Sequence, residues 1–362
     1  MAEAFAAAGH DTVLWTQDWS HALKARREPS VFAAGCGFSV KPVPVPGYRK
    51  NISFRRLWSH WRFAANWRSA AEAEARAGNL PDVIVLSSPP LYVGKMARAF
   101  RRNRPVRLVF DVMDAWPETF ERVAPRFALG WMRRIAGGNY RSADALSAVA
   151  SRYLELARSY GCAAPQRLCY HGIRLAPDCV GAARRLDGVR RLVYAGNMSL
   201  SYDLATVVDA VKSMPGLTLD LAGSGPDEPV LRRRAEGCSR IRFHGYLPEA
   251  ELRRLLEKAD AGIIPMFNDS CVGVPYKLAD YAAAGLPVIS SLHGETEELL
   301  ASYRAGTVCA VRDGASFLSA VADLDSAVKS GRVTSSGIAG LASAFDAGRL
   351  YSEYVRFVES IA

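Results

Sequence analysis

The sequence predicts an α/β protein with two Rossmann-like, doubly wound domains that face each other across a cleft. Strand-like and helical stretches alternate, an irregular stretch follows Gly172, and the alternation then restarts. A length of 362 residues suits about two domains of roughly 150 residues each. The chain opens on an Ala-rich helical run that Gly9 closes, so we expect the first strand of the N-terminal domain to be missing.

The first half supplies six strand-like stretches, at residues 12–16, 38–45, 83–87, 108–112, 145–149 and 167–170. Helical stretches lie between most of them, near 57–77, 91–103, 125–141 and 151–160. The irregular run IRLAPDCVGAARRLDGVR after Gly172 is typical of a linker. We therefore assign residues 1–172 to an N-terminal domain.

The second half repeats the pattern, with strands at 192–195, 217–222, 241–245, 262–266, 287–291 and 307–311. Helices are predicted at about 203–213, 227–236, 248–258, 276–284, 295–303 and 315–329. We assign residues 173–345 to a C-terminal domain. A last helix at 347–360 has an apolar stripe, and we expect residues 346–362 to pack back on the N-terminal domain.

Composition narrows the class of protein. No apolar run approaches the roughly 18 residues of a membrane-spanning helix, and Glu3 near the start argues against a signal peptide. The seven cysteines are scattered and never form Cys-x-x-Cys, which favours reduced thiols in the cytoplasm over a disulfide framework or zinc site. The net charge of +10 indicates an anionic partner.

Two glycine turns follow strands of the second half. Gly196 and Asn197 end YAGN, where glycine would let backbone N–H groups approach a phosphate near a helix N-terminus. A tight turn that needs a small residue explains the same pattern equally well. Gly223 belongs to LAGSGP, which also serves plain chain reversal, but it should lie on the same sheet edge.

Lys277 and Asp280 are three residues apart, so their side chains share one helical face. Lys277 could pair with a diphosphate and Asp280 could accept hydrogen bonds from ribose hydroxyls, although a solvated ion pair is the plainer interpretation. Gly294 and Glu295 stand where the next strand meets its helix. Glu295 either offers a carboxylate to sugar hydroxyls or simply favours the helix dipole. We interpret this edge as a nucleotide-sugar site.

The first half adds two candidate features. DVMDAWPE, residues 111–118, leaves a strand with carboxylates and Trp116, which indicates a substrate wall; the alternative is a buried Trp with Asp114 capping the next helix. Residues 49–68 carry six basic residues, three Trp and no acid. This segment suits an anionic membrane surface, or its apolar stripe of Phe54, Leu57, Trp58, Trp61 and Ala65 packs on the sheet.

Together these motifs resemble family 4 glycosyltransferases of the GT-B fold. The similarity rests on YAGN at 194–197, LAGSGP at 221–226, FHGYLP at 243–248 and PYKLADYAAAGLPVISS at 275–291. DAWP at 114–117 is similar to bacterial surface-polysaccharide members that add amino-deoxy sugars to lipid-linked acceptors. Two departures are that Val272 stands where the family has the first Glu of an acidic pair, with Asp280 as the second, and that GNMSLSYD lacks the usual Arg/Lys pair.

The resemblance implies that the N-terminal domain is the acceptor side and that the C-terminal domain binds the nucleotide sugar. Lys277, Glu295 and Asp114 would be catalytic. The donor would be bound by Gly196, Asn197, Gly223, His244, Tyr246, Tyr276, Lys277, Asp280 and Gly294.

It further implies a retaining glycosyltransferase that needs no metal or other cofactor. The enzyme would transfer a sugar from a nucleotide diphosphate to a polysaccharide or lipid-linked acceptor, with no nucleic-acid partner. We expect it in the cytoplasm, bound to the inner membrane face through residues 49–68. The alternatives are a catalytically impaired GT-B partner of an active transferase and, less favoured, a sugar-nucleotide epimerase.

Overall fold

The structure is a computed structural model of the chain, which describes residues 1–21, 23–32, 37–49, 53–122, 124–175 and 186–362. The chain divides into two compact units. Unit 1 comprises Met1–Tyr170 with Gly348–Ala362, and unit 2 comprises His171–Ala347. The linker expected after Gly172 falls partly at 176–185, outside the described residues.

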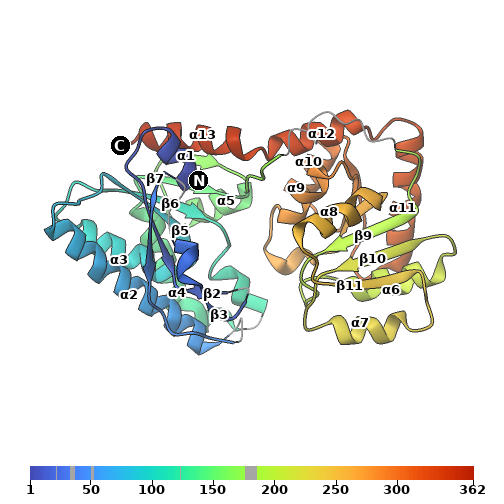
Figure 1. The fold of residues 1–362 in the computed structure, drawn as a ribbon, viewed down its shortest axis with the longest axis horizontal. Helices are drawn as coiled ribbons and strands as arrows, with labels where there is room; N and C mark the ends of the chain where they lie inside the picture. Colours follow the sequence, from blue (N-terminus) through green and yellow to red (C-terminus); the bar gives the residue numbers. More distant parts are fainter. Residues whose placement is uncertain (22, 33–36, 50–52, 123, 176–185) are drawn as a thin grey trace. The chain divides into compact units, whose positions relative to one another are not determined.

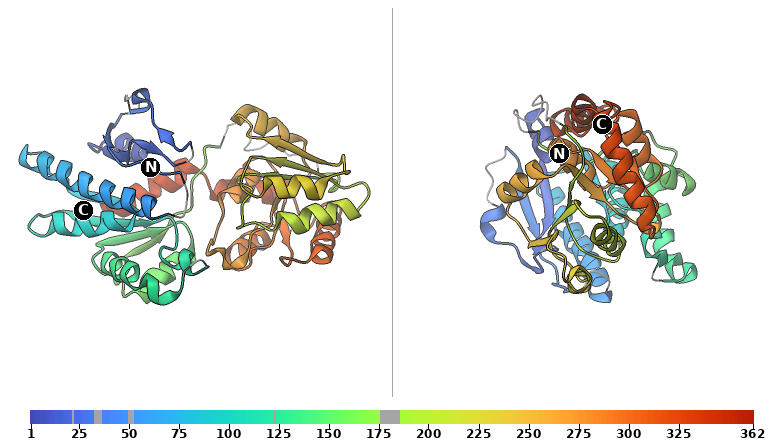
Figure 2. Two further views of the ribbon diagram at one scale, coloured as in Figure 1. Left: turned by 90° about the horizontal axis from the view of Figure 1, so that it is seen from below. Right: turned by 90° about the vertical axis from the view of Figure 1, so that its right-hand side faces the viewer.

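In its described residues, unit 1 contains two parallel sheets and one short hairpin. Strand β1 pairs with β4, while β5, β6, β7 and β8 pair in that order in a separate sheet (Figures 1 and 2). The strands are β1 Val13–Gln17, β2 Trp19–Ser20, β3 Ala25–Arg26, β4 Ser39–Val43, β5 Val83–Ser88, β6 Arg107–Val112, β7 Ala145–Ala148 and β8 Gln166–Leu168. The helices are α1 Ala2–Ala7, η1 Pro29–Phe32, α2 Phe54–Arg76, α3 Leu91–Arg101, η2 Glu118–Arg122, η3 Arg126–Leu129, α4 Gly130–Arg141, α5 Ser151–Ser159 and α13 Ala347–Glu359. That a first strand is missing from this unit stays a prediction.

The apolar side chains of β6 and β7 explain why these two strands form the centre of their sheet. Five of the six residues of β6 and all four of β7 are buried, as expected for parallel strands covered on both faces. Among the buried residues of β6, Asp111 has an ionisable side chain, and only 2% of its surface is exposed. It therefore cannot contribute to the substrate wall that the sequence suggested for residues 111–118.

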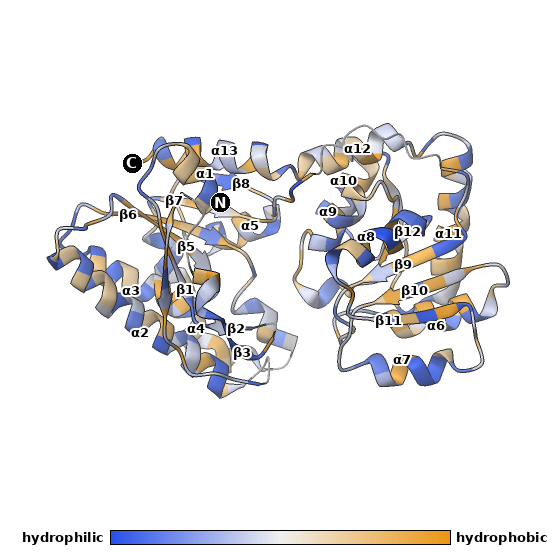
Figure 3. Cartoon of the chain, viewed as in Figure 1, coloured by the Kyte–Doolittle hydropathy of each residue, from blue (hydrophilic) through white to orange (hydrophobic). Residues whose placement is uncertain are grey.

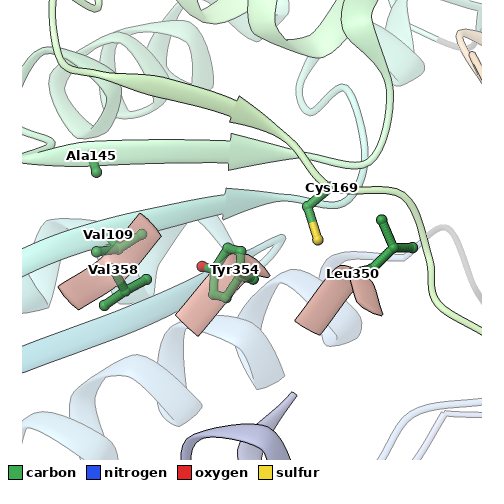
Figure 4. Close-up of a cluster of buried hydrophobic side chains, with 6 residues drawn as sticks. All are labelled: Val109, Ala145, Cys169, Leu350, Tyr354 and Val358. Carbon is green, nitrogen blue, oxygen red and sulfur yellow. The ribbon is translucent and has the colours of Figure 1, made fainter. Parts of the chain in front are cut away.

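The last helix of the chain, α13, completes the core of unit 1. Leu350, Tyr354 and Val358 recur every four residues and so share one face of the helix. That face packs on side chains of β6, β7 and the end of β8: Val109, Ala145 and Cys169 (Figure 4). A segment nearly 200 residues away in sequence thus closes the hydrophobic core over this sheet.

Helix α2 does not pack on the sheet through the aromatic residues of its apolar stripe. Its buried residues are Ser59, His60, Ala64, Trp67 and Ala71. Phe54, Trp58 and Trp61 are 91%, 51% and 40% exposed. The alternative of a stripe packed on the sheet is therefore wrong for these three aromatic residues. Residues 50–52 of the predicted membrane segment lie outside the described residues.

Unit 2 has one six-stranded parallel sheet in the order β11-β10-β9-β12-β13-β14. Its strands are β9 Arg191–Ala195, β10 Thr218–Ala222, β11 Ile241–Gly245, β12 Ala261–Ile264, β13 Val288–Ser290 and β14 Gly306–Val308. Its helices are α6 Leu204–Ser213, α7 Glu228–Ala235, α8 Glu249–Lys258, η4 Asn268–Ser270, α9 Tyr276–Ala283, α10 Glu295–Ser302, α11 Gly314–Lys329 and α12 Ser335–Ala344. Helices α7 and α8 are largely hydrophilic (Figure 3), and few of their residues are buried.

Helix α12 was not predicted, because its sequence SSGIAGLASA is weakly periodic and contains two glycines. Packing stabilises it instead. A Cβ at Gly337 would lie 2.0 Å from the Tyr303 carbonyl oxygen, so the small residue allows close contact with the C-terminal end of α10. The Thr334 hydroxyl caps the helix by accepting the Gly337 N–H at 3.0 Å. The β2–β3 hairpin escaped prediction because each of its strands has only two residues.

Candidate functional site

The strand order of unit 2 creates a crevice at one edge of its sheet. From β9 the chain moves outward through β10 and β11, then returns to the other side of β9 with β12. The loops after β9 and β12 therefore diverge at a topological switch point, where open α/β sheets bind ligands. Gly196 and Asn197 follow β9, and Lys277 and Asp280 follow the loop after β12.

Helix α9 is held at this crevice by Tyr281. The buried Tyr281 hydroxyl accepts the Ala195 N–H at 2.9 Å, at the very end of β9. Its ring crosses β12 at Gly262, where a Cβ would lie 2.4 Å from the ring. Tyr281 therefore fixes α9 beside the loop after β9.

Lys277 points from that first turn toward the loop after β9. Its Nζ donates to the Tyr202 hydroxyl at 2.8 Å and lies 4.3 Å from the centre of the Tyr202 ring. It also lies 5.1 Å from the centre of the Tyr194 ring. The two Tyr rings hold the ammonium group by cation–π attraction and leave its other protons for a ligand.

Gly196 serves the site through its missing side chain. A Cβ on residue 196 would lie 2.7 Å from Lys277 Nζ, and the residue has a φ of +141°. The Gly196 N–H donates to the Ala222 carbonyl at 2.9 Å, which removes it as a phosphate donor. The role of Gly196 and Asn197 in binding the diphosphate stays a prediction, and it would have to use groups other than the Gly196 N–H.

Gly223 lets the two glycine loops touch. A Cβ there would lie 2.0 Å from the Gly196 carbonyl oxygen, and the φ of Gly223 is +115°. The Met198 N–H donates to the Ser224 carbonyl at 3.0 Å, which joins the loops a second time. YAGN and LAGSGP therefore form one packed platform at the sheet edge.

Asp280 lies one turn after Lys277 with its side chain exposed. Among the described residues, no hydrogen bond or ion pair within 4.0 Å joins the Asp280 carboxylate to Lys277 or to another side chain. The intrahelical ion pair is therefore not formed. Desolvation by nearby protein raises the pKa of Asp280, and the charge of Lys277 opposes that rise. Its carboxylate oxygens can accept hydrogen bonds from ligand hydroxyls.

Helix α10 begins at the same edge. Gly294 is its N-cap residue with a φ of +74°, and Glu295 is its first residue and half-buried. The loop after β12 is tied to this helix start at two points. The Asn268 side-chain oxygen accepts the His293 N–H at 3.0 Å, and the Thr296 hydroxyl donates to the Gly273 carbonyl at 2.7 Å.

Three further residues were predicted to bind the sugar donor: His244, Tyr246 and Tyr276. Their surroundings differ. His244 Nε2 lies 2.6 Å from the Asp220 carboxylate, so a neighbouring strand orients its ring. Tyr246 is 84% exposed. Tyr276 stacks on His171 with ring centres 3.7 Å apart, although 58% of its surface remains exposed.

Sequence reasoning missed two residues that shape this site, Tyr202 and His171. Tyr202 bridges in antiparallel fashion to Met266, so the loops after β9 and β12 hold it beside Lys277. His171 meets Tyr276 across a separation of more than 100 residues. No local motif marks either residue, because only the folded loops bring them to the site.

Comparisons with known proteins match both halves of the chain. Residues 1–172 match the model described as "Glycosyl transferase 4-like domain", and residues 189–326 match "Glycosyl transferases group 1". The chain belongs to the family 4-like glycosyltransferases. The family and the GT-B fold that the sequence motifs predicted are thus confirmed.

Curated relatives of this glycosyltransferase cover parts of the chain. Glycogen synthase of Mycobacterium tuberculosis is 31% identical over 160 residues, which is 42% of this chain and 37% of that protein. The putative colanic acid biosynthesis glycosyltransferase WcaL of Escherichia coli is 29% identical over 115 residues, which is 29% of this chain and 28% of WcaL. The matches therefore span 37% or less of the length of these relatives.

Solved structures cover nearly the whole of this glycosyltransferase. Sucrose-phosphate synthase from Thermosynechococcus elongatus gives a TM-score of 0.77 at 16% identity, over 99% of this chain and 91% of that one. Anabaena HepE, in complex with UDP and glucose, gives 0.67 at 14% identity, over 97% of this chain and 100% of that one. At these identities the likeness establishes the fold.

Asp114 of this glycosyltransferase belongs to unit 1. It accepts hydrogen bonds from Trp116 Nε1 and the Thr119 hydroxyl, both at 3.1 Å, and burial raises its pKa. Trp116 is 4% exposed and stacks on His60, so it is no open platform for a sugar. The interpretation of this pair as a substrate wall is wrong for Trp116, and a catalytic role for Asp114 stays a prediction.

The described part of this glycosyltransferase contains no group of three or more His, Cys, Asp or Glu side chains arranged to hold a metal ion. None of its described helices combines the length and the apolar character needed to cross a membrane.

Proposed function

We propose that the protein is a retaining glycosyltransferase that moves a sugar from a nucleotide diphosphate to a polysaccharide or lipid-linked acceptor without a metal cofactor. The observation that carries the proposal is the position of Lys277. Two Tyr rings and the Tyr202 hydroxyl aim its ammonium group at Gly196, beside the switch point of unit 2. A positive charge fixed there matches the diphosphate of a donor.

The proposed chemistry is electrostatic. As the bond between the sugar and the diphosphate breaks, negative charge grows on the leaving diphosphate, and a preorganised cation stabilises it more than it stabilises the bound donor. Lys277 supplies that cation. The N-terminus of α10 at Gly294 adds the positive end of a helix dipole, while Glu295 stands at the donor sugar and Asp280 accepts the ribose hydroxyls.

The comparisons support this class of donor. Anabaena HepE is described in complex with UDP-glucose and the pneumococcal O-GlcNAc transferase GtfA in complex with UDP and GlcNAc. The names of WcaL and of AmsK from Erwinia amylovora refer to the biosynthesis of colanic acid and amylovoran. We therefore favour a UDP-linked donor and a polysaccharide or lipid-linked acceptor.

The proposal is tested by measuring nucleotide-sugar binding by calorimetry and donor turnover, first with UDP-glucose and UDP-GlcNAc. Lys277→Ala should weaken donor binding by roughly tenfold or more, because it removes a charge-assisted contact. Asp280→Ala should weaken binding of UDP but hardly that of pyrophosphate, which lacks ribose. Lys258→Ala and Asp323→Ala change exposed residues of unit 2 outside the site and serve as controls.

If neither site variant alters affinity or turnover while the wild-type protein binds a donor, the assignment of the site fails. Donor binding without any hydrolysis or transfer would instead favour the alternative of a non-catalytic partner of an active transferase.

We also propose that the protein works on the inner face of the membrane, in contact with anionic lipid through α2. Phe54, Trp58 and Trp61 are exposed on this helix, and Arg55 and Arg62 beside them are exposed too. Aromatic side chains enter the lipid boundary while Arg side chains meet anionic headgroups. A lipid-linked acceptor would then be presented from the same surface.

A further inference from the structure

Unit 1 contains a cluster of basic side chains outside the site already described. His21 and Lys24 come from the β2–β3 turn, and Tyr48 comes from the loop after β4. His21 Nδ1 lies 2.9 Å from the Tyr48 hydroxyl and 3.3 Å from Lys24 Nζ. Lys24 Nζ also lies 5.3 Å from the centre of the Tyr48 ring. The neutral His21 ring thus accepts at Nδ1 from two donors, which leaves its proton on Nε2.

The first turns of α2 add two more basic groups. Arg56 is hydrogen-bonded to Tyr48, and its guanidinium lies 5.2 Å from the centre of the Trp116 ring. His60, one turn later on the same helix face, stacks on Trp116 with ring centres 5.4 Å apart. Two separate segments of unit 1, the β2–β3 turn and α2, therefore converge on one cationic cluster, formed by His21, Lys24, Arg56 and His60.

The electrostatics of this cationic cluster confirm that its members face one another. Burial and the charge of Arg56 lower the pKa of Lys24, and burial with Arg56 and Lys24 lowers that of His21 to about 4. Burial, Arg56 and His21 lower the pKa of His60 to about 3. Asp114 is the carboxylate that acts on Arg56. At neutral pH both imidazoles are therefore uncharged, and Lys24 and Arg56 carry the charge of the cluster. Holding two cations together is unfavourable, so this arrangement is explained better by a ligand than by stability.

Unused donors and acceptors give a second, independent sign of a ligand. His60 is 7% exposed, and its Nδ1 atom has no hydrogen-bond partner among the described residues. The same holds for the buried Nε1 of Trp19, whose ring lies 6.2 Å from that of Tyr48. Buried polar atoms are nearly always hydrogen-bonded in folded proteins, so these two nitrogens are unusual next to a cationic cluster.

We propose that the cationic cluster binds a phosphate or diphosphate ester, the group through which a lipid-linked acceptor would be held on unit 1. An Arg fork, a Lys point charge and two imidazoles match the several oxygens and the double charge of a phosphate. An uncharged sugar hydroxyl would not require two cations, and a carboxylate would neutralise only one. The nature of the acceptor in this proposal rests on the proposed function.

The test measures binding of inorganic pyrophosphate by calorimetry in a Lys277→Ala background, in which the cation of unit 2 is removed. Lys24→Gln should weaken the remaining affinity by about tenfold, because one charge-assisted contact is lost. Lys24→Arg should restore most of it. Arg158→Gln removes the same charge from an exposed position of α5 outside the cluster, and should change the affinity less than about twofold.

Parallel titrations with farnesyl diphosphate and glucuronic acid identify the source of the anion. Binding of both diphosphates that depends on Lys24 supports the proposal, and tighter binding of farnesyl diphosphate identifies a lipid-borne group. Equal affinity for the two diphosphates identifies the phosphate alone as the feature recognised. The proposal is overturned if the protein does not bind pyrophosphate, or if Lys24→Gln leaves the affinity for pyrophosphate unchanged. It is also overturned if glucuronic acid binds more tightly than pyrophosphate. Near-ultraviolet circular dichroism verifies that Lys24→Gln is folded.

This test is separate from that of the proposed function. Pyrophosphate binding to the cationic cluster needs neither a nucleotide sugar nor turnover. If the donor assignment fails while Lys24-dependent binding persists, the anion site stands and the transferase proposal falls. If donor binding follows Lys277 but pyrophosphate ignores Lys24, the transferase proposal stands and the anion site falls.

Discussion

Lys277 Nζ lies 2.7 Å from the position that a Cβ on residue 196 would occupy. The small size of Gly196 is therefore what allows the ammonium group to reach the end of β9. The two residues are 81 positions apart in sequence, and the hydrogen bond between the Ala195 N–H and the Tyr281 hydroxyl helps to hold α9 beside the loop after β9. A glycine that the sequence suggested as a phosphate-binding turn acts through the lysine beside it.

Gly196→Ala should displace the Lys277 side chain and weaken donor binding about as much as Lys277→Ala, by roughly tenfold. The new Cβ also meets a φ of +141°, which costs about 1 kcal/mol of stability. Calorimetric titration with a UDP-sugar measures the first effect and thermal unfolding the second.

Gly216→Ala is the matched control for Gly196→Ala. Gly216 has a φ of +86°, and a Cβ there would meet nothing within 4 Å. It should therefore lose a similar amount of stability and keep its donor affinity. Equal loss of affinity in both variants would show that strain in the backbone, not contact with Lys277, is responsible.

Tyr202→Phe removes the 2.8 Å hydrogen bond to Lys277 and keeps the ring 4.3 Å from the ammonium group. Donor affinity should fall by roughly 3- to 10-fold, less than in Lys277→Ala, because the cation–π contact remains. Tyr202→Leu, which loses the ring as well, should be weaker still. An affinity equal to wild type in both variants would mean that Tyr202 does not position Lys277.

The double change Trp58→Ala and Trp61→Ala should reduce binding to anionic vesicles by roughly tenfold or more, because it removes the aromatic surface of α2. Sedimentation with phosphatidylglycerol-containing vesicles measures this, and higher salt should weaken the wild-type binding. Leu200→Ala, which changes an apolar residue of unit 2 that is 78% exposed, is the control. If all these proteins sediment equally, α2 is not the lipid-binding surface.

Asp111→Asn should make the free energy of unfolding of the protein depend less on pH. Burial raises the pKa of Asp111 to about 6 from 3.8, although its carboxylate accepts the Ser147 hydroxyl at 2.6 Å. A raised folded pKa means stability that is present below pH 3.8 and lost as pH rises through 6. Asn keeps the hydrogen bond without the charge, so the variant should gain about 1–3 kcal/mol relative to wild type between pH 4 and pH 7.5.

Urea unfolding at several pH values measures this difference in the free energy of unfolding. Asp82→Asn changes an exposed carboxylate of unit 1 and is the control. If the difference in free energy of unfolding between Asp111→Asn and wild type stays constant from pH 4 to pH 7.5, the pKa of Asp111 is not raised in the folded protein. The hydroxyl of Tyr354 lies 3.4 Å from that of Ser147, so the same measurement reports on the core under α13.

Local patterns were enough to predict most strands and helices of both units. The apolar runs of β6 and β9 to β13, and the helices between them, follow directly from side-chain periodicity. Helix α12 and the β2–β3 hairpin failed this approach because contacts distant in sequence stabilise them. The apolar stripe of α2 shows the same limit, since its aromatic residues Phe54, Trp58 and Trp61 are left exposed.

The candidate site was predicted as a set of residues at one sheet edge, and the structure decides how they act. Lys277 and Asp280 share a face but form no ion pair, while the Gly196 amide is already bonded to β10. Asp111 and Trp116 are buried, so the wall expected in unit 1 is not exposed. Burial and hydrogen-bond partners depend on packing between distant segments, which spacing along the chain does not contain.

By itself, then, the sequence determined the α/β class, the family and the edge of the sheet at which a ligand would bind, because periodicity and glycine turns are local properties. Only the tertiary structure decided that Gly196 makes room for Lys277, that Tyr202 holds it, and that four basic side chains of unit 1 converge. Those relationships join residues from different loops, and each exists only when the sheets and helices between them have packed.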